Sequence, residues 1–214
     1  MVKSIRDIIN KVNNNNNNEK KKNDKKNNMS KTTNKVLVGF DAEWPPKYDG
    51  SKTRVSLVQL AIETQVWLVD VRLLEELEEE EEDSRRLVPT GLLLDQVLTH
   101  VMTSNQFVKI GHGVRIDIKE CRRSYPRAKC FASGSAGKNV VELTAMWKNS
   151  KRNRGDPIPA SLSDMAQKIL KKPLDKSCAM SDWGRRPLSN AQVHYAALDA
   201  HVALKIAEGL SYYP

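Results

Sequence analysis

The chain has 214 residues, a formal net charge of +9 and a hydrophobic content of 39%. No apolar run reaches the roughly 20 residues of a membrane-spanning helix, and the N-terminus lacks the apolar core of a secretory signal. Three cysteines (Cys121, Cys130 and Cys178) give an odd count without paired zinc spacing, which favours free thiols in a reducing compartment. We therefore expect an intracellular protein, in the nucleus or the cytoplasm, with no membrane partner.

The first 35 residues differ in composition from the rest. They hold ten Lys and Arg against three acids, and six consecutive asparagines at 13–18. Burial of so little apolar surface does not offset the entropy lost on ordering. Residues 1–35 are therefore expected to form a disordered basic tail. Residues 36–210 are long enough for one domain with a sizeable core.

Three strands are predicted at the start of this domain. Val36–Phe40 is apolar and strand-favouring, and similar runs follow at 54–62 and 66–71, with a turn at Asp49-Gly50 before the second. Eight acids between Glu75 and Asp83 then indicate a solvated surface insertion.

Helices and strands alternate in the remainder. Pro89 opens a helical pattern, 107–110 is a fourth strand, and 116–123 is helical. Residues 131–138 and 148–158 are predicted loops, the second of them basic. Capping patterns at Ser161–Asp164 and Ser189–Gln192 start two more helices. Pro173 should end the first helix, and Gly209 should end the second near Glu208. This order of elements predicts an α/β domain with a mixed sheet.

Two carboxylates follow the first strand. Side chains alternate along a strand, so Asp41 and Glu43 face the same side. Paired carboxylates repel each other, and a divalent cation such as magnesium or manganese relieves the repulsion. Taken alone, this pair also fits a solvated strand end.

Three further residues extend the pattern. Asp117 lies near the start of a helix, where the plainer interpretation of a lone Asp is that it complements the helix dipole. Tyr195 and Asp199 are four residues apart on one helix face, among small apolar residues. A hydrogen-bonded Asp at a helix edge, with Tyr195 in the core, is the plainer interpretation of that pair.

The stretches FDAEW (40–44), GHGVRID (111–117) and SDWGRRPLSNAQVHYAALDAHVAL (181–204) resemble the three motifs of the DEDDy 3′–5′ exonucleases. This group includes ribonuclease D, the Werner helicase exonuclease domain and the Nibbler-type exonucleases. The resemblance covers residues 36–208, with the motifs in the family's order and spacing. One departure is Gly113, where many relatives carry Asn.

The resemblance implies a ribonuclease-H-like (DnaQ-like exonuclease) α/β fold with a mixed five-stranded sheet in the order 3-2-1-4-5, flanked by helices. It also implies that four carboxylates converge on two divalent cations, Mg²⁺ or Mn²⁺, while Tyr195 orients the attacking water. The four are Asp41, Glu43, Asp117 and Asp199.

Four residues are candidates for substrate contact. Trp44 could stack on a terminal base or cover the core edge, and His112 could contact phosphate or satisfy a turn. Arg185 and Arg186 suit phosphate geometry, although one of them could instead pair with Asp182 and hold the loop.

These features predict a metal-dependent 3′–5′ exonuclease that releases 5′-mononucleotides from the 3′ ends of single-stranded RNA or DNA, with RNA slightly favoured. The alternative is a nucleic-acid-binding or scaffold domain of the same fold without turnover. A coincidental set of acids in an unrelated α/β domain is a third reading, which the order of the motifs disfavours.

Overall fold

The computed structural model describes residues 35–46, 53–77, 90–132, 134, 136–150, 153 and 155–210. Several features that the sequence singles out lie outside these ranges. They are the basic tail up to residue 34, the Asp49-Gly50 turn, the acidic run beyond Leu77, Pro89, and Lys151, Arg152 and Arg154 of the basic loop. The expectations for those segments stay predictions.

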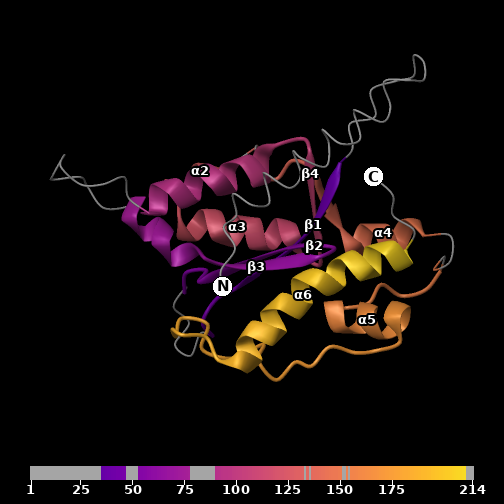
Figure 1. The fold of residues 1–214 in the computed structure, drawn as a ribbon. Coiled ribbons are helices and arrows are strands. Elements are labelled where there is room, and N and C mark those ends of the chain that lie inside the picture. Colours follow the sequence, from indigo (N-terminus) through magenta and orange to yellow (C-terminus); the bar gives the residue numbers. More distant parts are fainter. Residues whose placement is uncertain are drawn as a thin grey trace, which may run out of the picture.

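One mixed sheet with the strand order β3-β2-β1-β4-β5 forms the centre of the fold (Figure 1). The strands are β1 (Val36–Glu43), β2 (Leu57–Ile62), β3 (Gln65–Asp70), β4 (Phe107–Gly111) and β5 (Val140–Glu142). The first three strands are antiparallel neighbours, whereas β4 runs parallel to β1 and β5 runs parallel to β4. The expected ribonuclease-H-like sheet is confirmed.

Helices cover both faces of the sheet (Figure 1). Helices α2 and α3 lie on one face, whereas α6 crosses the other face and contacts β1 to β4. Helix α5 packs on the outer side of α6. The bounds are α2 (Thr90–Thr103), α3 (Val114–Ser124), α4 (Leu143–Asn149), α5 (Leu162–Leu170) and α6 (Asn190–Gly209), with 3-10 turns η1 (Val71–Leu77) and η2 (Lys129–Phe131). A separate apolar core fills each side of the sheet.

The second strand begins three residues later than the sequence predicts. The main chain at Val55 bonds to helix α3 instead of to a strand, because its amide donates to Ser124 Oγ and its carbonyl accepts from the Tyr125 hydroxyl. Residues 53–56 therefore precede the strand, and of these Ser56 still donates its amide to the Glu43 carbonyl of β1.

The two capping patterns are confirmed. Ser161 Oγ accepts a hydrogen bond from the Asp164 amide at 3.1 Å. The Ser189 side chain accepts from the Gln192 amide, while the Gln192 side chain accepts from the Ser189 amide in return. Helix α6 includes Gly209 instead of stopping at it. A Cβ on this glycine would lie 2.3 Å from a methyl carbon of Ile169, so the residue permits close packing of α6 on α5.

Strand β5 and helix α4 were not predicted from the sequence. The strand has only three half-buried residues, so it carries no clear alternation of apolar and polar side chains. All three cysteines are free thiols. Within the part of the chain that is described, no helix combines the length and the apolar character needed to cross a bilayer.

Candidate active site

Strand β1 carries the first two carboxylates to the edge of the sheet. Asp41 and Glu43 are half-buried on one face of the strand, and Ala42 between them is buried on the other. Because β4 runs parallel to β1, the carboxyl ends of both strands meet at this edge. Whatever follows β4 is therefore brought toward the two carboxylates.

The turn after β4 and the first turn of α3 bring in Asp117. Gly113 adopts the left-handed conformation (φ 83°) and offers no capping side chain to the helix. Glu142, at the end of β5, supplies the cap: its two oxygens accept from the amides of Gly113 (2.8 Å) and Arg115 (2.9 Å). Asp117 itself is only 8% exposed, and its Oδ2 has no hydrogen-bond partner in the described chain.

Helix α6 supplies Asp199 through an unusually close approach to β1. A Cβ on Gly39 would lie 2.0 Å from the carbonyl oxygen of Ala200, so glycine is the residue that fits there. Ala196 and Ala200 are fully buried at this contact. The small residues around Asp199 therefore let the helix place this carboxylate beside Asp41.

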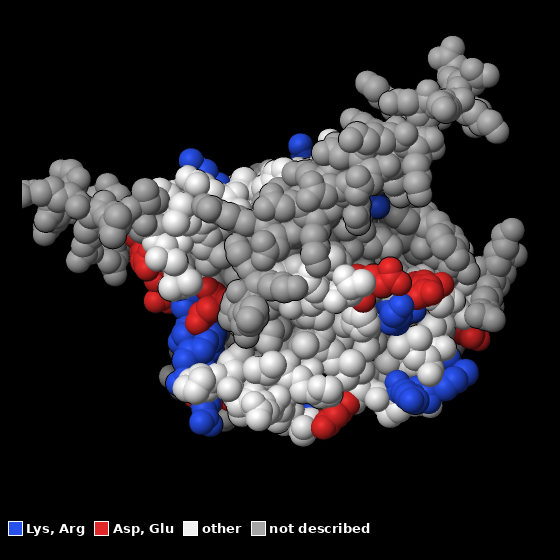
Figure 2. Space-filling model, viewed as in Figure 1, with Lys and Arg blue, Asp and Glu red and all other residues white. Residues whose placement is uncertain are grey.

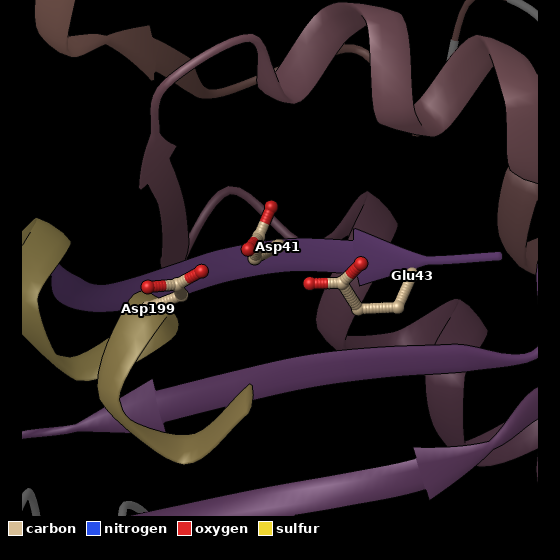
Figure 3. A group of neighbouring side chains, drawn as sticks. All are labelled: Asp41, Glu43 and Asp199. Atoms are coloured by element: carbon tan, nitrogen blue, oxygen red, sulfur yellow. The ribbon is translucent and has the colours of Figure 1, made fainter. Parts of the chain in front are cut away.

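Three of the four carboxylates converge. Asp41, Glu43 and Asp199 each offer an oxygen, and these oxygens lie within 4.8 Å of one another (Figure 3). Figure 3 shows the first two side chains leaving β1 and the third leaving α6, with their carboxyl groups directed into a shared space. Asp117 lines the same cavity of about 340 Å³ but is not part of the tight group.

Burial and mutual repulsion raise the pKa values of this cluster in the metal-free protein. Burial, followed by the charge of Asp199, raises the pKa of Asp41 to about 7. Burial and the other three carboxylates raise the pKa of Glu43 to about 9. Burial raises the pKa of Asp199 to about 6 and that of Asp117 well above its ordinary value. The neighbouring positive charge of Lys176 lowers the pKa values of Asp41, Glu43 and Asp199 but does not offset burial and repulsion.

The donor set fits a divalent cation. Hard cations such as Mg²⁺ and Mn²⁺ prefer carboxylate oxygens, and they relieve the repulsion that raises these pKa values. The unpartnered Oδ2 of Asp117 is a further free oxygen at the same cavity. The residues that could hold the metal are therefore Asp41, Glu43, Asp199 and, at the same cavity, Asp117.

Tyr195 borders the cavity one helical turn before Asp199. A hydrogen bond with Tyr195 lowers the pKa of Asp199, opposing burial, and the tyrosine ring packs against Trp183 with centroids 5.8 Å apart. Burial and the neighbouring carboxylates raise the pKa of Tyr195 above its ordinary value. The phenol is consequently protonated at neutral pH and acts as a hydrogen-bond donor.

The sequence matches the profile of a family described as 3′–5′ exonuclease over residues 18–212. The chain belongs to this exonuclease family. The human exonuclease mut-7 homolog is 29% identical over 188 residues, which cover 81% of this chain and 20% of that protein. The mouse bifunctional 3′–5′ exonuclease/ATP-dependent helicase WRN is 30% identical over 179 residues, covering 81% of this chain and 11% of the relative.

A solved structure has the same architecture. The Nibbler EXO domain of Aedes aegypti superposes with a TM-score of 0.66 at 25% identity, covering 84% of this chain and 79% of that domain. The chain spans about a fifth or less of the length of the two curated relatives.

The four substrate-contact candidates of this exonuclease domain lie in different surroundings. Trp44 and His112 both line the carboxylate cavity, and His112 Nε2 is buried without a hydrogen-bond partner in the described chain. Arg185 is exposed outside the cavity lining. Arg186 forms an ion pair with Asp70 at 2.7 Å and donates to three backbone carbonyls, so it holds its loop. Its acidic partner is Asp70, whereas the alternative drawn from the sequence named Asp182.

Two residues near the carboxylate cavity were not predicted from the sequence. Lys176 lines the cavity, but nothing in the stretch KKPLDK distinguishes it from Lys171 and Lys172. Glu142 caps the helix of Asp117, but it belongs to the strand that the sequence did not predict.

Proposed function

We propose that this chain is a divalent-metal-dependent 3′–5′ exonuclease that removes 5′-mononucleotides from single-stranded nucleic acid. Membership of the exonuclease family supports the reaction class. The observation that carries the proposal is the convergence of the Asp41, Glu43 and Asp199 oxygens within 4.8 Å, from segments far apart in the chain. Folding alone would not favour gathering like charges in a half-buried cavity.

In the proposed reaction, the four carboxylates hold two divalent cations, which would activate water and stabilise the leaving oxygen when bound. The Tyr195 hydroxyl, fixed by Asp199, directs the attacking water. The water oxygen bonds to phosphorus and the bond from phosphorus to the 3′ oxygen breaks. That oxygen takes up a proton and becomes the new 3′ hydroxyl, and the released nucleotide keeps the 5′ phosphate.

The cavity suits the end of a flexible polymer. Its volume of about 340 Å³ lies in the range of small-ligand pockets and accommodates a single nucleotide. Trp44 would stack on the terminal base, and the unpartnered His112 Nε2 would contact phosphate. Arg185 remains a candidate contact outside the cavity, whereas Arg186 is assigned to the loop. We favour RNA over DNA because residues 174–200 resemble ribonuclease D and Nibbler-type proteins.

We assign the exonuclease unit to residues 36–210 and the basic tail, residues 1–35, to a separate segment. The three free cysteines support a location inside the cell, in the nucleus or the cytoplasm. On the face seen in Figure 2, basic side chains form small separate groups with acidic ones between them. The described part of this face therefore presents no continuous basic stripe.

The test is digestion of 5′-labelled RNA and DNA oligonucleotides of the same sequence, with Mg²⁺, Mn²⁺ or chelator, resolved to single nucleotides. We expect a ladder that shortens from the 3′ end, release of 5′-mononucleotides, and no reaction in chelator or with a blocked 3′ end. The variant combining Asp41→Asn and Asp199→Asn should be inactive, whereas Asp156→Asn, an exposed control, should match the wild type. Oligonucleotide binding without shortening in Mn²⁺ would refute the proposal in favour of a scaffold.

A further inference from the structure

One cationic side chain lies at the carboxylate cavity without a role in the proposed reaction. Lys176, in the loop between α5 and α6, is the only Lys or Arg among the described residues that line this cavity. Four carboxylates and Tyr195 border the same space. The charge of Lys176 therefore acts at the place where a phosphate would enter.

The loop that carries Lys176 is fixed to the rest of the domain. The main chain of Leu174 bonds through both its amide and its carbonyl to Ser163 Oγ in α5. Next along the chain, Asp175 accepts from the Ser177 amide at 2.8 Å, and the Lys176 carbonyl accepts from the Ala179 amide. These bonds hold the backbone of Lys176 at a defined position beside the cavity.

The ammonium group itself is uncommitted. It is exposed, and the described residues provide it with no hydrogen-bond acceptor and no ion-pair partner. Two other cations of the domain are occupied: Arg186 is bonded to Asp70, and the buried Lys109 donates to the Met102 carbonyl at the end of α2. A fixed backbone with a free ammonium is the arrangement expected of a ligand-binding lysine.

The field of Lys176 reaches the centre of the site. Its charge lowers the pKa values of Asp41, Glu43 and Asp199, in opposition to the larger effect of burial. Among the described residues, Lys176 forms no ion pair with any of these carboxylates, although it lines the same cavity and its ammonium can therefore accept a further anionic group there.

We propose that the Lys176 ammonium binds a non-bridging oxygen of the scissile phosphate and stabilises the negative charge that develops there. This inference rests on the proposed exonuclease function. As the water oxygen adds to phosphorus and the 3′ oxygen leaves, charge accumulates on the non-bridging oxygens, and a fixed cation opposes it. In this contact the Lys176 ammonium donates a hydrogen bond to the phosphate oxygen.

The matched variants are Lys176→Met and Lys172→Met. Lys172 is an exposed lysine four residues earlier and outside the cavity lining, so it controls for the loss of one positive charge. In single-turnover digestion with Mn²⁺, we expect Lys176→Met to slow cleavage by about 10²–10³-fold. We expect Lys172→Met to stay within about threefold of the wild type, and Lys176→Arg to regain part of the loss.

A sulfur substitution locates the contact. Phosphorothioates of each stereochemistry at the terminal linkage replace one non-bridging oxygen at a time. When sulfur replaces the oxygen that Lys176 contacts, cleavage by the wild type should slow. Cleavage by Lys176→Met should not slow further, because this variant has already lost the contact. Equal thio effects in the wild type and Lys176→Met, for both stereoisomers, would overturn the proposal.

Binding measurements separate this inference from the proposed function. With Ca²⁺ in place of a catalytic metal, Lys176→Met should weaken binding of a 5′-mononucleotide about tenfold and leave binding of the nucleoside unchanged. If Lys176→Met leaves the mononucleotide affinity unchanged, the phosphate contact is refuted. It is also refuted if the variant loses Mn²⁺ affinity and thermal stability to the same extent as mononucleotide affinity. If the wild type is inactive but its affinity for the mononucleotide still depends on Lys176, the proposed exonuclease function is refuted and the phosphate contact is not.

Discussion

Replacing Asp41 by Asn should stabilise the metal-free protein. The carboxylate is half-buried beside Asp199, and its pKa rises from 3.8 to about 7, which corresponds at most to about 4 kcal/mol of unfavourable free energy when the group is ionised. Solvent penetration and relaxation reduce that figure, so we expect Asp41→Asn to gain about 1–2 kcal/mol at pH 8. For a domain of this size, the melting temperature should rise by about 2–8 °C.

The sign of the pH dependence follows from the direction of the shift. Because the folded chain holds the Asp41 proton to a higher pH than the unfolded chain does, stability falls as the pH rises from about 4 through about 7. In chelator, the melting temperature of the wild type should therefore fall between pH 5.5 and pH 8. The Asp41→Asn variant should show a weaker fall.

The assay is thermal unfolding at pH 8 in chelator and again in Mn²⁺. A metal present at about 100 times its dissociation constant stabilises the protein by about 2.7 kcal/mol, so the wild type should overtake Asp41→Asn when Mn²⁺ is added. The exposed Asp156→Asn variant should follow the wild type in both conditions. If Asp41→Asn melts below the wild type in chelator at pH 8, the claim of repulsion among the carboxylates is wrong.

Three other substitutions test separate parts of the site. Tyr195→Phe keeps the packing on Trp183 but loses the hydroxyl, so single-turnover cleavage should slow by about 10–100-fold at unchanged oligonucleotide affinity. An unchanged cleavage rate would show that the Tyr195 hydroxyl does not direct the attacking water. Arg186→Lys cannot reproduce the bonds to Asp70 and the loop carbonyls, so the free energy of unfolding should fall by about 1–3 kcal/mol. Weaker nucleic-acid binding at unchanged stability would instead indicate that Arg186 contacts the substrate. Gly39→Ala pushes α6 away from β1 and should lower both thermal stability and Mn²⁺ affinity. The control Gly137→Ala, whose new Cβ has no atom closer than 4.0 Å, should lower neither. Retained Mn²⁺ affinity in Gly39→Ala would contradict the role of this contact.

Residues with a local signal were predictable from the sequence. The apolar run before Asp41 indicates a strand that ends at the sheet edge, and alternation along it places Glu43 on the same side. The capping box at Ser189 fixes the start of α6, which makes the shared face of Tyr195 and Asp199 a matter of helical spacing.

Residues whose role depends on distant contacts were not predictable in this way. Whether Arg186 meets a phosphate or a carboxylate depends on where Asp70 lies in the folded chain, 116 residues away in sequence. Glu142 is recognisable as a helix cap only after β5 has paired with β4. Lys176 differs from the lysines before it only by facing the cavity, which depends on tertiary structure alone.

The most direct measurement is an anomalous difference map from crystals of the protein soaked in Mn²⁺, recorded at the manganese absorption edge. The proposed metal site predicts density at about 2–2.5 Å from oxygens of Asp41, Glu43 and Asp199, with Asp117 completing the site. The density should disappear in the Asp41→Asn variant. A map without manganese among these oxygens, from crystals in which Mn²⁺ is bound elsewhere, would contradict it.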